Sequence, residues 1–318
     1  MDIKTFGENI LERMNEKLPD YYDRKRLQYV EIPKNNGQIL HGIVAPIKDV
    51  QAAPVEYIDR YFEEYQKGKS ISTITDAIVE KYLTYPSASE VIKNDLLDYD
   101  NVKDHLQVRI YDAELNKERL NDKVHYIDGD FAVCYAVNIS EDNGVQSFLV
   151  TDKLLDAWDI EPDELHTDAI ESDLKRGVLF CSLQELMLSK MGYDDAENYF
   201  TGDYEKKEPM YVLTNTTGMY GAGLIESELV RERIAEVIED SFYILPSSLH
   251  EVIIVPEADM DIDIDELSNI VKTTNQNVVD IDDFLSDKVQ HCDELTLKME
   301  NAKLHELRAK EVNNDFFM

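Results

Sequence analysis

The sequence predicts an α+β protein in which a mixed, mainly antiparallel sheet is flanked by helices. Three observations favour this class. Apolar residues recur at helical spacing near the amino end, two β-rich runs flank a turn signal at 35–37, and a second pair of apolar runs follows at 241–257. Strands and helices grouped in this way, without regular alternation, are typical of α+β folds.

The first part, 1–85, is expected to fold as helix, hairpin, helix and helix. The opening helix places five apolar residues on one face: Ile3, Phe6, Ile10, Leu11 and Met14. The run 26–47 predicts a hairpin, because Asn35, Asn36 and Gly37 supply positive-φ residues for a tight turn. Two helices follow, at 53–68 and 70–83, and 84–90 is expected to be a linker.

The second part, 86–258, is expected to be a sheet domain. Alternation predicts a strand at 105–112, and the apolar run 130–140 predicts a central strand. A strand and two helices are expected at 146–174, with Thr151 or Asp152 as a cap, and a further helix at 227–240.

The third part, 259–318, is expected to be an acidic helical segment. Its first helix begins after Asp263 or Asp265, and 278–307 is expected to be helical as well. A calcium loop starting at Asp259 is excluded, because Ile264 and Ile270 occupy the positions that need glycine and glutamate.

Charge is the most unusual property of the chain. It has 66 acidic and 32 basic residues, a net charge of −34. Such a surface disfavours direct binding to nucleic acid or to an anionic membrane, and favours a partner protein with a basic surface. One hypothesis is that carboxylates in 141–173 and 226–283 imitate DNA. Simple solubility is the alternative.

The compartment is expected to be the cytoplasm. There is no stretch of 18 apolar residues and no apolar signal core, and three cysteines far apart give no disulfide framework.

The segment 241–257 suggests a catalytic site, because Ser247, Ser248, His250 and Glu251 lie close together. The elbow glycines of a hydrolase are missing, so a hairpin with Pro246 in its turn is favoured. The alternative is a hydrolase-type enzyme that also uses residues of a distant segment. The candidate signature or interaction residues are Asn215, Tyr220, Gly221, Pro246, Ser247, Ser248, His250 and Glu251, with Thr214 beside them.

No cofactor and no metal are expected. The seven histidines are scattered, and the runs that begin at His250 and His305 lack the second histidine of a zincin helix. The run 216–223 contains glycines but lacks the Gly-Lys-Ser/Thr of a phosphate-binding loop.

Several segments in order resemble a bacterial family known as domain of unknown function 5688, which is frequent in gut Firmicutes and often lies near mobile-element genes. They span most of 34–256 and include "KNNGQILHGIVAP", "LLDAWDIEPDELHTDAI", "MYVLTNTTGMYGAGLI" and "FYILPSSLHEVIIVP". The last two are more distantly similar to the YtpQ-like proteins. The resemblance implies one evolutionary unit over this range, and no reaction or catalytic residue.

The leading expectation is therefore a non-enzymatic protein-interaction module of a mobile element, with DNA mimicry as the hypothesis for its acidic surface.

Overall fold

The structure is a computed structural model that describes residues 1–48, 53–84, 96–140, 146–202, 207–259 and 263–315. The chain divides into two compact units, Met1–Asn101 and Val102–Met318. Each contains helices and sheets, and every strand pair among the described residues is antiparallel. The expected α+β class is confirmed.

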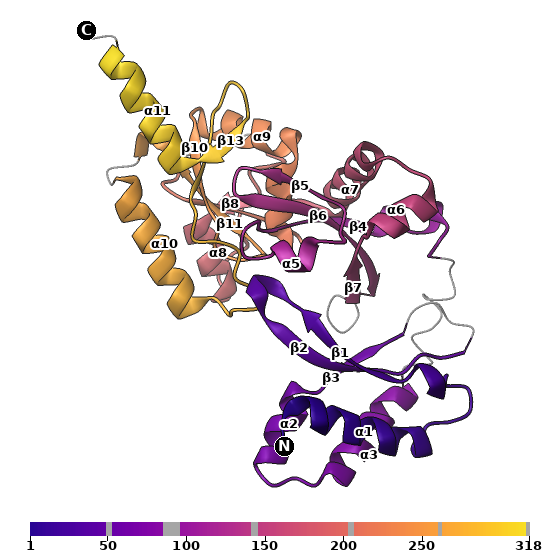
Figure 1. The fold of residues 1–318 in the computed structure, drawn as a ribbon. Helices are drawn as coiled ribbons and strands as arrows, with labels where there is room; N and C mark the ends of the chain where they lie inside the picture. Colours follow the sequence, from indigo (N-terminus) through magenta and orange to yellow (C-terminus); the bar gives the residue numbers. More distant parts are fainter. Residues whose placement is uncertain (49–52, 85–95, 141–145, 203–206, 260–262, 316–318) are drawn as a thin grey trace. The chain divides into compact units, whose positions relative to one another are not determined.

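The first unit is a three-stranded sheet with helices on one face (Figure 1). Its elements are α1 (Ile3–Lys17), β1 (Gln28–Pro33), β2 (Ile39–Val44), β3 (Val55–Tyr57), α2 (Asp59–Gln66) and α3 (Ile71–Thr84). The first helix, the hairpin and α3 are confirmed. The expected start of the second helix is wrong, because residues 55–57 pair with β2 as a strand. Apart from Thr84, the expected linker lies outside the described residues.

The core of this unit is formed by the apolar face of α1 and by α3. Phe6, Ile10 and Met14 are fully buried together with Ile74 and Ile78. Burial of side chains of this size supplies most of the free energy that holds a helix on a sheet.

The second unit contains two sheets, and β6 is the centre of the smaller one. This sheet consists of β4 (Leu106–Asp112), β5 (His125–Asp128), β6 (Phe131–Ser140) and β7 (Gln146–Leu149). After β7 the chain forms α6 (Asp152–Trp158) and α7 (Pro162–Arg176). Thr151 caps α6, since its Oγ1 accepts a hydrogen bond from the backbone N–H of Leu154.

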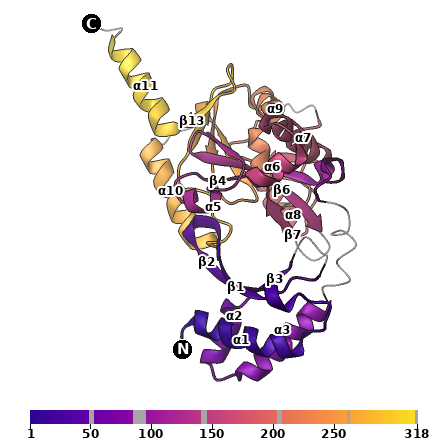
Figure 2. The ribbon, with the colours of Figure 1, turned by 45° about the vertical axis from the view of Figure 1, so that its right-hand side comes forward.

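The larger sheet has six strands in the order β13-β12-β10-β11-β9-β8. They are β8 (Val178–Ser182), β9 (Tyr211–Asn215), β10 (Phe242–Leu245), β11 (Val252–Pro256), β12 (Gln290–Cys292) and β13 (Met299–Asn301). The helices of this region are α8 (Leu183–Lys190), α9 (Glu228–Ile238), α10 (Ile264–Val278) and α11 (Ala302–Asp315). Figure 2 shows α10 and α11 beside this sheet.

The hairpin of β10 and β11 is confirmed, and Asp263 is the residue that caps α10. The expectation of helix throughout 278–307 is wrong. Residues 290–292 pair with β10 and residues 299–301 pair with β12, so this stretch adds two strands to the sheet. In the described part of the chain, no helix has the length and apolar character needed to cross a membrane.

Candidate functional site

The two segments singled out in the sequence, 214–221 and 246–251, meet in the structure. The hydroxyl of Thr214 donates a 2.8 Å hydrogen bond to the carbonyl oxygen of His250. The backbone N–H of Tyr220 donates a 3.0 Å hydrogen bond to Nδ1 of His250. The second segment is thus attached to the first through both the backbone and the ring of His250.

The glycine at 221 is required by this close approach. A Cβ at Gly221 would lie 2.5 Å from the backbone nitrogen of Asn215 and 2.5 Å from Oγ1 of Thr214. Tyr220 has a φ of 56°, which is unusual for an aromatic residue and marks a strained turn. Asn215 stabilises this turn, since its Oδ1 accepts from the N–H groups of Thr217 and Met219.

The ring of Tyr220 lies against two charged or titratable groups. The guanidinium of Arg109 is 3.6 Å from its centroid, and the imidazole of His250 contacts it edge-on. Arg109, on β4, is only 5% exposed and bonds to neutral partners at Asn138 and Ser147. The alternating pattern at 105–112 predicted the strand but not this contact of Arg109. Alternation alone does not distinguish a covered polar face from a solvated one.

The nucleophile–base contact of a hydrolase is not made. Oγ of Ser248 accepts a hydrogen bond from the backbone N–H of His250, and Nδ1 of the imidazole is occupied by Tyr220. The other ring nitrogen, Nε2, lies 3.2 Å from Oδ1 of Asp283. Because Nδ1 accepts a hydrogen bond, the matching tautomer carries its ring proton on Nε2, facing Asp283. Catalysis by Ser247, Ser248 and His250 stays a prediction that this geometry does not favour.

Of the remaining signature residues, Pro246 is buried and its carbonyl accepts a 3.4 Å hydrogen bond from Asn275. Ser247 and Glu251 are half-buried, and the carbonyl of Glu251 accepts from the N–H of Ser248. The cluster is therefore chiefly a set of contacts that hold loops together.

A buried carboxyl, that of Glu226, lies five residues after Gly221 in the chain. Glu226 is 4% exposed; its Oε2 accepts from the hydroxyl of Tyr126, and its Oε1 has no partner among the described residues. Burial, reinforced by the nearby Asp128 carboxylate, raises the pKa of Glu226 to about 8.

A second group of titratable side chains joins three elements of the larger sheet region. Glu257 follows β11, His291 lies on β12, and His305 lies in the first turn of α11. One possible ligand atom of each lies within 4.8 Å of the others, so side chains of these types could hold a metal ion. The sequence hid this group, because its members come from segments far apart in the chain.

An apolar hollow of about 340 Å³ lies beside α8. It is lined largely by the apolar side chains Leu183, Met187, Leu188, Met191, Pro209 and Met210. No residue of α8 is buried, although half of its residues are apolar.

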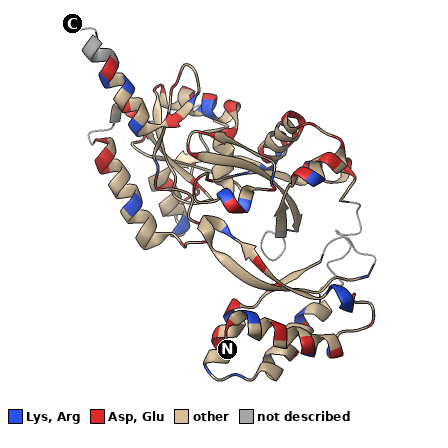
Figure 3. Ribbon diagram, in the orientation of Figure 1, with Lys and Arg blue, Asp and Glu red and all other residues tan. Residues whose placement is uncertain are grey.

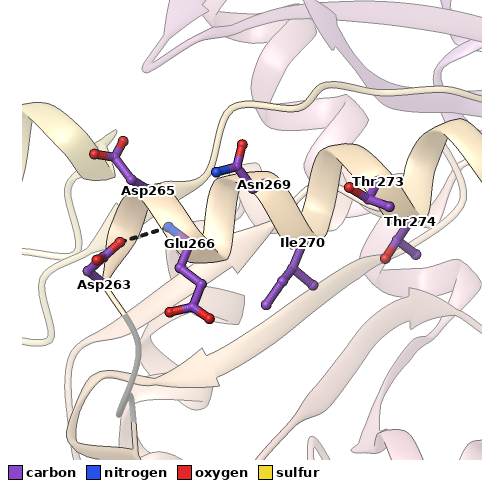
Figure 4. Close-up of a pocket in the computed structure, with 7 residues that line it drawn as sticks. All are labelled: Asp263, Asp265, Glu266, Asn269, Ile270, Thr273 and Thr274. Atoms are coloured by element: carbon purple, nitrogen blue, oxygen red, sulfur yellow. Dashed lines mark hydrogen bonds between the residues drawn. The ribbon is translucent and has the colours of Figure 1, made fainter.

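A further hollow of about 560 Å³ lies along α10 (Figure 4). The residues that line it all belong to α10 or to its cap: Asp263, Asp265, Glu266, Asn269, Ile270, Thr273 and Thr274. The Asp263 carboxylate is already used, since it accepts the N–H of Glu266. A hollow lined by one helix lacks the convergent walls of a small-molecule site.

The comparison with known families agrees with the resemblance seen in the sequence. The profile of a family of unknown function, DUF5688, matches residues 3–294. The chain belongs to the DUF5688 family. The match extends well beyond the 34–256 segment on which the resemblance was based, and in this DUF5688 chain it includes Glu257 and His291 but not His305. No curated protein and no solved structure matches the sequence.

Proposed function

We propose that this DUF5688 protein is a protein-binding module that takes a basic, amphipathic segment of a partner into the hollow beside α8. The observation that carries the proposal is a helix whose apolar side chains are left in solvent. Met191 is 70% exposed and Met187 is 53% exposed. Exposed apolar patches of this kind are characteristic of interaction surfaces, and methionine adapts its shape to different partners.

The charge of the chain supports a basic partner. Three acidic residues follow Met191 closely in the chain, and all three are exposed: Asp194, Asp195 and Glu197. Figure 3 shows further Asp and Glu on α6 and α7. The stretch 152–171 has eight acidic residues and one basic residue. An apolar patch on a chain with this excess of negative charge fits a helix with one apolar face and one basic face.

A DNA-binding protein remains the partner class that we favour, because its surface is basic. An accessory role in a mobile element and a cytoplasmic location are part of the same proposal, and rest on the family resemblance and on the composition. If the acidic surface imitates DNA, duplex DNA should compete with this chain for the partner.

The binding test uses a fluorescent 20-residue helical peptide of leucine and lysine. We expect it to bind the full chain, and we expect the double variant Met187→Ser/Met191→Ser to bind at least about tenfold more weakly because apolar contact is lost. The matched control is Val278→Ser/Leu295→Ser, which removes two apolar side chains elsewhere that are even more exposed, at 76% and 85%. Equal binding by wild type and both variants would show that attraction between charges alone retains the peptide.

The salt dependence separates the two contributions. Binding should weaken between 50 and 300 mM salt because exposed charges are screened, but the difference between wild type and the Met187→Ser/Met191→Ser variant should persist. Recovery of a basic protein from a low-salt pull-down by wild type and not by that variant would identify a natural partner.

A further inference from the structure

We propose that Glu257, His291 and His305 form a binding site for a divalent transition-metal ion of the zinc type. Neutral imidazole and carboxylate are ligands that zinc prefers. Two histidines and one glutamate supply three ligands, which leaves a fourth position for water.

The register of the larger sheet places the parts of this site together. Tyr243, His291 and Glu300 lie directly opposite one another on β10, β12 and β13. Residues opposite one another in adjacent strands project from the same face of a sheet. The helix α11 begins directly after β13, so its first turn brings His305 to that face, where its ring stacks on His291 with centroids 3.7 Å apart.

The distances are close to those that a metal needs. Nε2 of His291 lies 3.1 Å from Oε2 of Glu257. Zinc ligands at about 2.0–2.1 Å from the ion are themselves roughly 3.3 Å apart. The ligand atoms, now within 4.8 Å of one another, need only a small approach. The two imidazoles are parallel within 17°, so their rings must tilt for both lone pairs to reach one ion.

A neighbouring carboxylate orients the third ligand. Nδ1 of His305 lies 3.1 Å from Oε1 of Glu300, and Arg308 pairs with the other oxygen of Glu300. A proton held on Nδ1 by this carboxylate leaves the Nε2 lone pair of His305 for a metal. Such carboxylate–histidine pairs behind the ligands are usual in metal sites.

The site is partly exposed, so that an ion can enter it, and partly buried, so that the ion can be retained. The side chain of His291 is 2% exposed, whereas those of Glu257 and His305 are 40% and 29% exposed. Two ligands therefore face solvent, where an ion enters, while the third lies on the sheet. The ring of Tyr243 contacts the imidazole of His291 edge-on, with centroids 5.3 Å apart, and so covers one side of the buried ligand.

The test is calorimetric titration of the tag-free, EDTA-treated full chain with Zn²⁺ in 150 mM salt at pH 7.5. We expect one site per chain, and Co²⁺ in its place should give the absorption bands of four-coordinate cobalt. Glu257→Gln and His305→Gln should weaken binding about 100-fold, and Glu300→Gln about tenfold. The partly exposed ligands are chosen because their variants preserve the core.

The controls are His125→Gln and Glu294→Gln, which change an exposed histidine and an exposed carboxylate elsewhere. Both should bind Zn²⁺ like wild type. Several weak equivalents that all variants share, or one tight site that Glu257→Gln and His305→Gln leave intact, would overturn the proposal. Neither result depends on the peptide-binding surface at α8.

Discussion

Nδ1 of His250 accepts the backbone N–H of Tyr220 at 3.0 Å, and this bond joins two loops that are 30 residues apart in the chain. The pairing explains why both segments stand out in the sequence. Tyr220 adopts a left-handed backbone conformation, and its N–H would lose its partner without the imidazole.

Loss of the His250 ring should destabilise the second unit. His250→Ala leaves the Tyr220 N–H without its acceptor, which costs about 1–3 kcal/mol in a mostly buried setting. His250→Asn should recover part of that loss, since its amide oxygen can lie near the position of Nδ1. Urea unfolding of both variants measures this, with the exposed His125→Ala as a control near zero. Equal losses for alanine and asparagine would contradict the role of the hydrogen bond.

Substitution of Gly221 should be more costly than that of an unconstrained glycine. A Cβ at Gly221 meets backbone atoms, which cannot move aside as a flexible side chain can. We expect Gly221→Ala to cost several kcal/mol, roughly the upper range of single substitutions. Gly192→Ala meets no atom within 4 Å and should cost only about 1 kcal/mol for its φ of 88°. Similar melting temperatures for the two variants would show that the 214–221 turn can relax.

The buried carboxyl of Glu226 should make stability depend on pH in a defined direction. Its pKa is raised from 4.5 to about 8, so the folded state holds the proton more tightly than the unfolded state does. The resulting stabilisation is complete below about pH 4.5 and is lost as the pH rises towards 8, at about 1.4 kcal/mol for each pKa unit that is realised. Glu226→Gln keeps a neutral group and should remove this loss.

The measurement is the free energy of unfolding of Glu226→Gln minus that of wild type, between pH 5 and pH 8. It should increase steadily with pH. The control Glu228→Gln, exposed on α9, should give a difference that stays within about 0.5 kcal/mol. If this difference in the free energy of unfolding did not change with pH, water would reach the Glu226 carboxylate and its pKa would not be raised.

Local patterns predicted much of the fold. The face of α1, the turn at Asn36 and Gly37, the β10–β11 hairpin and the Asp263 cap depend on residues near one another in the chain. The strand β12 depends instead on a distant partner, β10, and β13 in turn depends on β12. Each has three residues and no apolar alternation. Pairing of β12 with β10, and of β13 with β12, overrides a helical sequence pattern.

The candidate sites were harder to predict for a related reason. Alternation predicted the strand at 105–112, but all seven residues of β4 are buried, so alternation alone did not reveal that Arg109 is covered. Likewise, Glu257, His291 and His305 have none of the short spacings that reveal a metal site on one element. Only the register of the sheet brings them together.

The order of strands in the larger sheet also determines when this region can fold during synthesis. β10 lies between β11, which follows it within a few residues, and β12, which begins 45 residues after β10 ends (from Leu245 to Gln290). Until the ribosome has released β12, one edge of β10 has no partner and can pair with another chain. A nascent chain that stalls in this interval is therefore a target for chaperones, and the last strands complete folding by covering that edge.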